Sequence, residues 1–511
     1  MFLGWVNRPV PGFDVKWPFS GRSPLGSAAI SQGNLCVRAA PQGNCPAPYP
    51  PRMKILHAIH DFLPRHRAGS EIYAFQLCRE LSATHDVSVL CAEYDPSRSH
   101  GSMTARAFGG LPVLEMINNW EFHDFEETYS SSLLNRVLDE ALAAVAPDVL
   151  HIHNMLNLSV DLPRLAKARG IAVVATLHDY TLVCPSGGQR VHIAEQHVCH
   201  TIDPERCSRC FPESAFHAQM ACHRAARAAG AAPALLGVVD TVRRRAPRLF
   251  SALQRLASSP TAPLSAIDIT KRLAAMRRMF EHVDLFVAPS EALAAEYRAL
   301  GLALAKLKVS DYGFAPLTTA PREHREKLRI GFVGTLSWHK GAHVLLEAIA
   351  TLPCAAFELL IYGDPNVFPA YAQSLEAAAN GLPVHFMGGF DETRIAEVYA
   401  SIDVLVVSSL WPENSPLVIH EAFMAGVPVV GARQGGIPGL VADGVDGLLY
   451  DAYSSDDLAN ALKRLIDDPT LLARFASNLP AVKSIAEDAA EWTAVYEGMA
   501  GGRRSRPAAT A

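Results

Sequence analysis

Residues 411–430 read Trp-Pro-Glu-Asn-Ser-Pro-Leu-Val-Ile-His-Glu-Ala-Phe-Met-Ala-Gly-Val-Pro-Val-Val, and they decide which type of fold the chain adopts. An apolar strand is predicted just before them, and a helix is predicted over 417–424. Ala425 and Gly426 end that helix, and 427–430 has the composition of the next buried strand. In parallel sheets such a unit places the loop and the free N–H groups of the helix start at the carboxyl edge. The segment therefore predicts an α/β domain with a ligand site at that edge.

Two carboxylates, Glu413 and Glu421, are separated by seven residues in this segment. A carboxylate accepts hydrogen bonds from two hydroxyl groups and so suits a sugar or a ribose, whereas a helix start suits a diphosphate. Together these groups indicate a nucleotide sugar. The alternative is a surface Glu and a helix Glu with no joint role. The Gly-Val-Pro-Val-Val ending and the Gly-Gly-Ile-Pro at 435–438 favour the joint role.

The stretch resembles the E-x7-E signature of the large retaining glycosyltransferase family 4. This resemblance covers residues 53–499 and implies the GT-B fold, in which two Rossmann-like, doubly wound parallel-sheet domains enclose an interdomain cleft. It also implies roles for single residues. Glu421 would bind the ribose hydroxyls and Glu413 the hydroxyls of the transferred sugar. The amides of Ser415 and Leu417 would reach sugar or phosphate oxygens.

A second motif, at 334–341, reads Gly-Thr-Leu-Ser-Trp-His-Lys-Gly and follows a predicted strand. It resembles the family's glycine-rich stretch beginning at Gly334, in which an Arg and a Lys hold the diphosphate. Lys340 matches the Lys, but Thr335 stands where the Arg usually is. One cation fewer predicts weaker stabilisation of the leaving diphosphate, for which His339 or an arginine elsewhere would compensate. A plain surface lysine is the alternative for Lys340, and it is disfavoured because a cation at a helix start opposes the helix dipole.

In the N-terminal half, Arg-Ala-Gly-Ser-Glu at 67–71 lies at the first strand-to-helix turn and resembles the family's Gly-Gly-x-Glu loop. Gly69 there lets the backbone approach the donor phosphates or the acceptor. His153 and His178 end predicted strands, at the sheet edge where ligands bind. By the resemblance, His178 is the cleft histidine near the anomeric centre, and Asp179 beside it orients groups or meets the acceptor. A purely structural role is the alternative for each histidine.

Predicted strands and helices alternate from Met53 onward, which indicates parallel βαβ units. We expect an N-terminal acceptor domain over 53–310 and a C-terminal nucleotide-sugar donor domain over 311–499. The last helix, predicted over 470–498, is expected to pack back on the N-terminal domain. Residues 1–52, rich in Pro, Gly and Ser, are predicted to be a disordered extension, and 500–511 a disordered tail.

Residues 211–280 interrupt this alternation with a basic stretch of helical character. One interpretation is an interfacial helix pair that contacts anionic lipid or a lipid diphosphate, and the other is a solvated insertion with an apolar face on the domain. The net charge of −5 gives no reason to expect a nucleic-acid partner. With no apolar run of about 18 residues, a transmembrane helix is not expected. We therefore expect a cytoplasmic protein, in contact with the inner face of the membrane at most peripherally.

Four of the ten cysteines cluster over 184–210, directly after the His-Asp pair: Cys184, Cys199, Cys207 and Cys210. Four thiolates with a C-x2-C pair fit a tetrahedral structural zinc. Free cysteines, and a disulfide or cluster, are the alternatives that the spacing leaves open. For catalysis the resemblance implies no metal.

The function expected from these features is retaining transfer of a hexosyl group from a UDP- or GDP-linked sugar to a glycan or lipid-linked acceptor, in polysaccharide or glycoconjugate biosynthesis. His178, Lys340 and Glu413 are the expected catalytic residues. Two alternatives remain: a nucleotide-sugar epimerase on the same fold, and a GT-B binding or scaffold protein that has lost catalysis. Thr335 in the place of an Arg is a hint of the latter.

Overall fold

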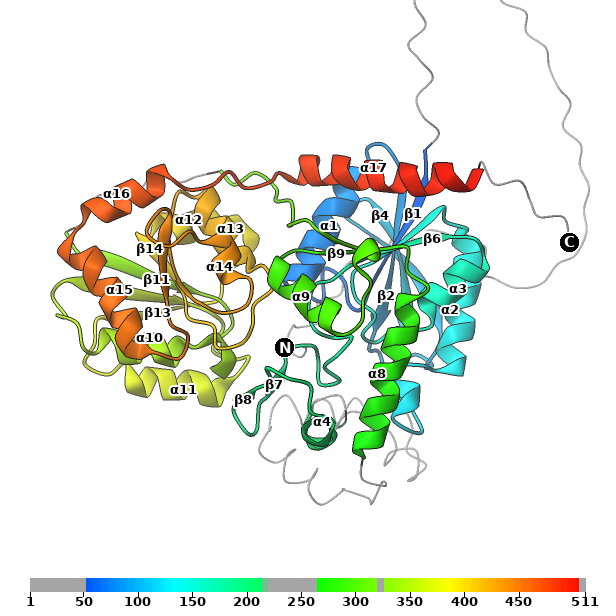
Figure 1. Ribbon diagram of the computed structural model, residues 1–511, viewed down its shortest axis with the longest axis horizontal. Helices are drawn as coiled ribbons and strands as arrows, with labels where there is room; N and C mark the ends of the chain where they lie inside the picture. Colours follow the sequence, from blue (N-terminus) through cyan, green and yellow to red (C-terminus); the bar gives the residue numbers. More distant parts are fainter. Residues whose placement is uncertain (1–51, 215–216, 218–263, 319–325, 505–511) are drawn as a thin grey trace, which may run out of the picture.

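The computed structural model describes residues 52–214, 217, 264–318 and 326–504, which form two α/β domains side by side (Figure 1). The predicted N-terminal extension, apart from Arg52, lies outside the described residues, and so does most of the basic insertion. Arg52 itself is part of the fold, because its guanidinium donates hydrogen bonds to the carbonyls of Ser82, Ala83 and Thr84.

The N-terminal domain is built on an eight-stranded sheet with the order β10-β9-β6-β5-β1-β2-β4-β3. All neighbouring strands pair in parallel except β3, which is antiparallel to β4. Central strands such as β1 are buried on both faces, which explains their nearly continuous apolar sequence. The strands are β1 Lys54–Ile59, β2 Asp86–Glu93, β3 Met103–Phe108, β4 Leu111–Ile117, β5 Val149–Ile152, β6 Ala172–Thr176, β9 Leu285–Ala288 and β10 Leu307–Val309.

The C-terminal domain has a six-stranded parallel sheet with the order β13-β12-β11-β14-β15-β16. This order reverses direction between β11 and β14, and open α/β sheets bind ligands at the carboxyl ends of the strands at such a reversal. The strands are β11 Leu328–Val333, β12 Phe357–Tyr362, β13 Val384–Gly388, β14 Val404–Val407, β15 Val429–Ala432 and β16 Gly447–Tyr450. Its helices are α10 Ala342–Ile349, α11 Pro369–Ala378, α12 Ile395–Ala400, α13 Leu417–Met424, α14 Ile437–Leu440, α15 Ser455–Asp467 and α16 Thr470–Ser477.

Helices cover both faces of the N-terminal sheet. One face packs against α2 Ser132–Val145, α3 Leu162–Ala168, α8 Ala266–Phe280 and α9 Glu291–Ala299. The other face packs against α1 Gly69–Leu81 and α17 Ile485–Arg504, the last helix of the chain. Figure 1 shows α17, in red, leaving the C-terminal domain and running across the N-terminal one. The chain thus crosses between the domains twice, which ties them together.

The GT-B arrangement of two parallel-sheet domains is confirmed, but several predicted elements were wrong in detail. The last helix is not continuous over 470–498: α16 ends at Ser477 and α17 begins at Ile485, because Pro480 cannot extend a helix. The tail was predicted to be disordered from residue 500, whereas α17 continues to Arg504. The hairpin of β3 and β4 was not predicted, although Gly109-Gly110 at its turn is a hairpin signal.

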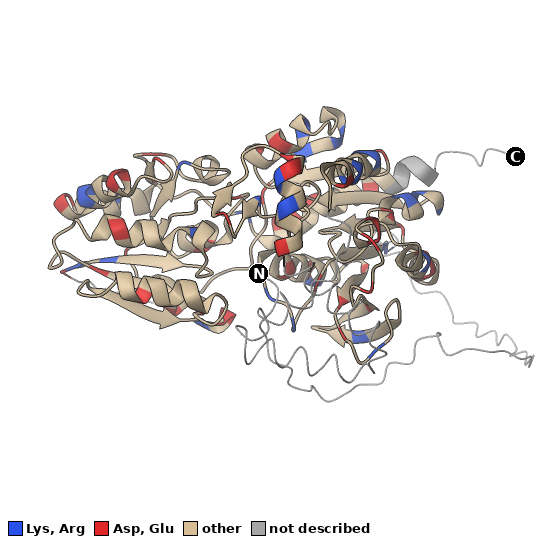
Figure 2. Cartoon of the chain, turned by 90° about the horizontal axis from the view of Figure 1, so that it is seen from below, with Lys and Arg blue, Asp and Glu red and all other residues tan. Residues whose placement is uncertain are grey.

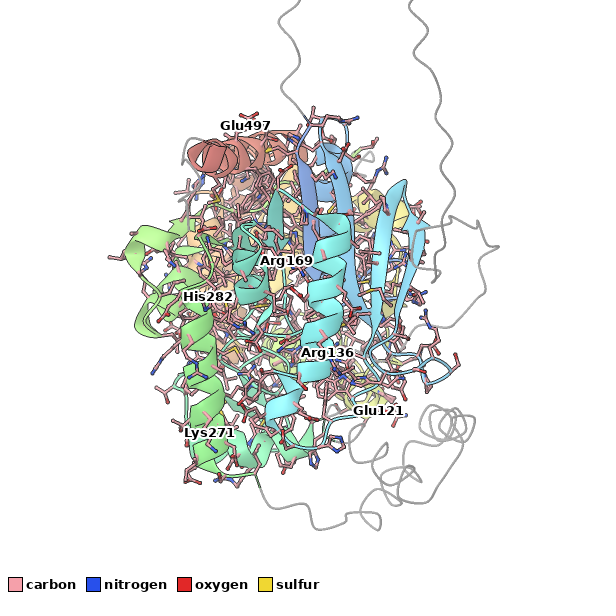
Figure 3. All side chains as sticks on the ribbon, turned by 90° about the vertical axis from the view of Figure 1, so that its right-hand side faces the viewer. Glu121, Arg136, Arg169, Lys271, His282 and Glu497 are labelled. Atoms are coloured by element: carbon pink, nitrogen blue, oxygen red, sulfur yellow. The ribbon has the colours of Figure 1, made fainter. Side chains whose placement is uncertain are left out.

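The cysteine-bearing loop and the described end of the basic insertion form a layer on the N-terminal domain. The loop contains a hairpin of β7 Val191–His192 and β8 His197–Val198, followed by α4 Pro204–Cys210. Helix α8 contacts α4 and buries Ile269, Met276 and Met279 against the domain. Figure 3 shows α8, with Lys271, along one edge of this domain, and α17, with Glu497, across its top. The described part of the insertion therefore has the apolar face on the domain that the second interpretation requires.

Candidate functional site

The candidate site lies where the strand order of the C-terminal sheet reverses. The turn that carries Lys340 follows β11, and the loop that carries Glu413 follows β14. Three hydrogen-bonded contacts join the two: the Leu410 amide donates to the His339 carbonyl at 2.8 Å, the Ser408 hydroxyl to the Lys340 carbonyl at 3.2 Å, and Lys340 Nζ to a Glu413 oxygen at 2.6 Å. Both sequence motifs of this domain therefore form one site.

Lys340 and Glu413 form its central ion pair. Glu413 Oε1 also accepts a hydrogen bond from the Ser409 hydroxyl at 2.6 Å, and its residue is only 5% exposed. Lys340 Nζ lies 5.2 Å from the centre of the Trp411 ring, on which the cation is further stabilised. Removing either partner would leave the other charge with a desolvation cost and no compensation, so each fixes the other.

Glycines allow this close packing of loops. Gly341 has φ +72°, and a Cβ added there would overlap the carbonyl oxygen of Ser408. A Cβ on Gly436 would overlap the carbonyl oxygen of Asn414, and one on Gly435, at φ +56°, would overlap the backbone of Glu413. The absence of side chains at Gly435 and Gly436 thus lets their backbone pack directly against the backbone of the Glu413 loop, which gives a physical reason for the Gly-Gly pair.

Glu421 lies one turn inside α13, which begins at Leu417 as predicted. Its Oε2 accepts a hydrogen bond from the Tyr399 hydroxyl at 2.8 Å. Burial raises the pKa of Glu421 to about 7, against the smaller lowering effect of this bond. Hydrogen bonds donated by the hydroxyl groups of a ligand would stabilise the ionised form of this buried carboxyl group.

Ser415 and Leu417 lie where the two domains touch. The Ser415 hydroxyl donates to Asp311 Oδ1 at 2.7 Å and contacts His420 Nε2 at 2.9 Å. Leu417 faces the start of α1: a Cβ added to Gly69 would come within 2.9 Å of the Leu417 Cδ1. Gly69 thus permits the starts of α1 and α13 to approach each other across the domain boundary.

His178 follows β6, and its position differs from the expectation in one respect. Both ring nitrogens bond to protein groups: Nε2 to His153 Nδ1 at 3.0 Å, and Nδ1 to the Tyr312 hydroxyl at 2.9 Å. Its side chain is therefore not free to bond a sugar in this structure. Its backbone carbonyl instead accepts a hydrogen bond from the side-chain amide of Asn414, across the domain boundary.

Asp179 bonds within its own loop. One oxygen accepts from the Thr181 amide at 2.7 Å and the other from Asn154 Nδ2 at 2.9 Å. Burial raises the pKa of Asp179 to about 6 against these bonds. In this structure Asp179 orders the loop after β6, next to Tyr180, whose hydroxyl donates to the Pro412 carbonyl at 3.0 Å.

The cation that Thr335 fails to supply is not replaced by His339. The His339 side chain is 2% exposed, and burial lowers its pKa to about 3, so the ring is neutral at pH 7. Gly334 and Thr335 are half-buried at the end of β11, and a Cβ added to Gly334 would meet open space. Lys340 is therefore the cation that the 334–341 motif itself offers to an anion.

The fold brings the four cysteines of the 184–210 loop near one another, and none of them forms a disulfide. Burial, together with the charges of the other three, raises the pKa of Cys207 to about 12. Arg272, 8% exposed, lies beside Cys184 and Cys207 and donates to the Thr181 carbonyl at 2.6 Å. Within the described residues the one group at metal-ligand spacing is a histidine group elsewhere, not these sulfurs. The structural zinc stays a prediction, and the disulfide alternative was wrong.

Sequence reasoning missed four residues that shape the site: Tyr399, Asp311, Tyr312 and Asn414. Asn414 lies inside the quoted motif, and its polarity next to Glu413 was a usable signal. The others come from segments with no motif, and their contacts depend on how the domains meet.

Charge and hydropathy of the described surface give little further indication of a partner. Acidic and basic residues are interspersed over both domains (Figure 2). None of the described helices is both long and apolar enough to cross a membrane.

Two protein-family models match this chain. The model of glycosyl transferases group 1 matches residues 319–481, and that of glycosyltransferase family 4 matches residues 67–203. Each matched segment contains one half of the site described above.

Curated relatives share the sequence over a shorter stretch. The D-inositol 3-phosphate glycosyltransferase of Corynebacterium glutamicum (strain R) is 34% identical over 157 residues, which are 29% of this chain and 37% of that protein. The enzyme of the same name from Rhodococcus opacus (strain B4) is 34% identical over 182 residues, 33% of this chain and 39% of that protein. The chain thus spans little more than a third of the length of these relatives.

Solved structures resemble most of the chain. HepE of Anabaena, in complex with UDP and glucose, has a TM-score of 0.54 at 18% identity and covers 89% of this chain and all of its own. Sucrose-phosphate synthase of Thermosynechococcus elongatus has a TM-score of 0.55 at 17% identity, covering 89% of this chain and 98% of its own. At this identity the likeness establishes the fold alone.

Proposed function

This chain belongs to glycosyltransferase family 4 and has the GT-B fold, and from that premise we propose that it transfers a sugar from a nucleoside diphosphate sugar to a hydroxyl group of an acceptor. The observation that carries the proposal is the Lys340–Glu413 ion pair at the strand-order reversal, with Glu421 on the following helix. A cation for a diphosphate and two carboxylates for hydroxyl groups match the parts of such a donor.

The proposed mechanism proceeds with retention. The sugar–phosphate bond loosens into an oxocarbenium-like state, and Lys340 with the amides at the start of α13 takes up the charge of the leaving diphosphate. Glu413, held by Lys340 and Ser409, accepts hydrogen bonds from the sugar, and Glu421 accepts them from the ribose. The acceptor hydroxyl attacks the anomeric carbon from the same face from which the diphosphate leaves, and a phosphate oxygen accepts the proton of the hydroxyl.

A UDP- or GDP-linked sugar is the proposed donor, and the UDP and glucose in HepE support the former. For the acceptor we propose a glycan or a lipid-linked saccharide. The name of the relatives adds an inositol phosphate as an acceptor to be tested.

The test is nucleotide binding followed by product analysis. Nucleotide binding is measured first, as the shift of the unfolding temperature with UDP, GDP, ADP and CMP. A ligand at about 100 times its Kd stabilises by about 2.7 kcal/mol. Labelled nucleotide sugar is then incubated with candidate acceptors, and the anomeric configuration of the product is read by NMR.

Each outcome separates the candidate functions. A shift that Glu421→Ala abolishes, with a transferred product of unchanged anomeric configuration, supports the proposal. Binding with an epimerised donor and no acceptor product would favour the epimerase. Binding without any conversion, or no binding at all, would favour a protein that has lost catalysis, with Thr335 as the first residue to restore to Arg.

A further inference from the structure

Three polar rings lie in the core of the N-terminal domain, beneath α17. His57 on β1, His151 on β5 and His153 just after it are 0%, 0% and 3% exposed. A row of hydrogen bonds links two of them to the candidate site: His57 Nδ1 to His153 Nε2 at 2.9 Å, His153 Nδ1 to His178 Nε2 at 3.0 Å, and His178 Nδ1 to the Tyr312 hydroxyl at 2.9 Å. We call His57, His153, His178 and Tyr312 the imidazole ladder.

A metal site is the competing explanation, because the ligand nitrogens of His57, His151 and His153 lie within 4.8 Å of one another. Two of the three ring pairs, however, are stacked: His151 on His153 at 4.3 Å and 22°, and His57 on His153 at 5.2 Å and 19°, while His57 and His151 are tilted by 39°. In nearly parallel stacked rings the nitrogen lone pairs lie in separate, parallel planes. The lone pairs of metal ligands must instead converge on the position of the ion. His151 also uses both nitrogens, bonding the Tyr496 hydroxyl at 2.6 Å and the Thr176 hydroxyl at 2.8 Å. The hydrogen-bonded row accounts for the geometry better than an ion.

The histidines of the ladder are neutral, so its hydrogen bonds must all run in one direction. Burial lowers the pKa of His57 and of His178 to about 3, and that of His153 well below its usual value. A neutral imidazole has one donor and one acceptor, so every ring in the row must donate in the same direction. With Tyr312 as the first donor, each histidine carries its proton on Nε2 and accepts on Nδ1.

The ladder ends at the segment that joins the two domains. Tyr312 is in the linker between β10 and β11, and its neighbour Asp311 accepts a hydrogen bond from Ser415 of the 411–416 loop at 2.7 Å. The same loop returns to the ladder, because the Asn414 side chain donates to the His178 carbonyl. These contacts thus form a closed chain: from His178 to the linker, from the linker to the 411–416 loop, and from that loop back to His178.

We propose that His57, His153 and Tyr312 are positioning residues, which hold His178 and the interdomain linker so that the 411–416 loop, with Glu413, keeps its place against the N-terminal domain. The proposal rests on the proposed function for its catalytic consequence, but its structural part stands alone. Loss of the Tyr312 hydroxyl removes the hydrogen bond between the linker and His178 and leaves only the stacking of the two rings. The 411–416 loop then loses the support that reaches it through the linker, while the hydrogen bonds from Tyr180 to Pro412 and from Asn414 to His178 remain.

The matched pair for the test is Tyr312→Phe and Tyr496→Phe. Each substitution removes one hydroxyl that bonds a buried histidine, but Tyr496 lies on α17 and bonds His151, which stacks on His153 and is not a member of the hydrogen-bonded row. Hydrogen exchange of the 411–417 amides is measured for both. We expect Tyr312→Phe to speed this exchange at least ten-fold and Tyr496→Phe to leave it within two-fold. Equal exchange in both variants would overturn the proposal, and this readout requires no enzymatic activity.

A second pair tests the ladder from its far end. His57→Asn retains an acceptor at the position of Nδ1, whereas His57→Leu removes it. We expect Leu to lower kcat at least ten-fold with the nucleotide Kd within two-fold, and Asn to restore most of kcat. If kcat falls equally in both variants, or in neither, the positioning role is wrong. If the wild-type protein transfers no sugar while the exchange result holds, the proposed function fails and the positioning of the loop stands.

Discussion

If Glu421 binds the ribose as proposed, the binding of a nucleotide sugar should strengthen as the pH rises through 7, because the carboxyl must ionise to accept two hydroxyl hydrogen bonds. Burial raises its pKa to about 7, and Tyr399 supplies the hydrogen bond that opposes this shift. In its protonated form the carboxyl donates one hydrogen bond and accepts fewer. The protonated form is therefore the wrong partner for two donating hydroxyl groups.

The size of the effect follows from the ionised fraction. If only the carboxylate binds, the apparent Kd equals the intrinsic Kd divided by that fraction. With a pKa of about 7, the ionised fraction is about 0.9 at pH 8 and about 0.03 at pH 5.5. The affinity should therefore fall about 30-fold between these pH values, or about 2 kcal/mol.

Calorimetric titration with an intact nucleotide sugar is the assay. Its diphosphate is a diester, whereas the terminal phosphate of a free nucleoside diphosphate itself titrates near pH 6 and would confuse the result. Glu421→Gln should bind more weakly at pH 8 and show no pH dependence. Tyr399→Phe should move the midpoint to a higher pH, because the opposing hydrogen bond is gone. A flat wild-type profile, or the same slope in the Gln variant, would refute the reasoning.

Stability should change in the opposite direction. A carboxyl whose folded pKa lies above its unfolded value binds more protons when folded, so its contribution declines as the pH rises from about 4.5 to about 7. Glu421→Gln removes this penalty and should raise the free energy of unfolding relative to wild type at pH 8 more than at pH 5, as measured by urea denaturation. An equal change at both pH values would contradict the assigned pKa.

Three further predictions concern other parts of the molecule. Lys340→Ala should lower kcat about 100-fold or more and Lys340→Arg less, and kinetics that do not distinguish the two would mean that no charge at this position meets the diphosphate. Gly341→Ala should lower the free energy of unfolding, measured by urea denaturation, much more than Gly426→Ala does. Both glycines have positive φ, but only a Cβ at Gly341 would overlap a neighbour, the Ser408 carbonyl. Equal losses of stability would exclude this overlap as the cause. Metal analysis should find about one zinc per chain, lost when a cysteine of the 184–210 loop is changed to serine; a metal-free protein whose four thiols react with an alkylating reagent would have free cysteines instead.

Local pattern in the sequence determined the fold class and the C-terminal half of the site. The 411–430 segment predicted strand, loop, helix and strand, and the structure has β14, α13 and β15 there. Lys340 and Glu413 could be assigned to one site because parallel strands deliver their following loops to the same edge. This inference needed only the alternation of strands and helices along the chain.

Tertiary structure alone decided what these residues contact. His178 was expected to face a ligand, yet His153 and Tyr312 take both of its nitrogens. Tyr312 comes from a linker without a motif, and no local pattern predicts which side chain such a linker brings to a buried ring. His339 was considered as a substitute cation, but burial keeps it neutral. Burial and partners of this kind arise from separate segments, such as those of His178 and Tyr312, 134 residues apart, and periodicity along one segment cannot report them.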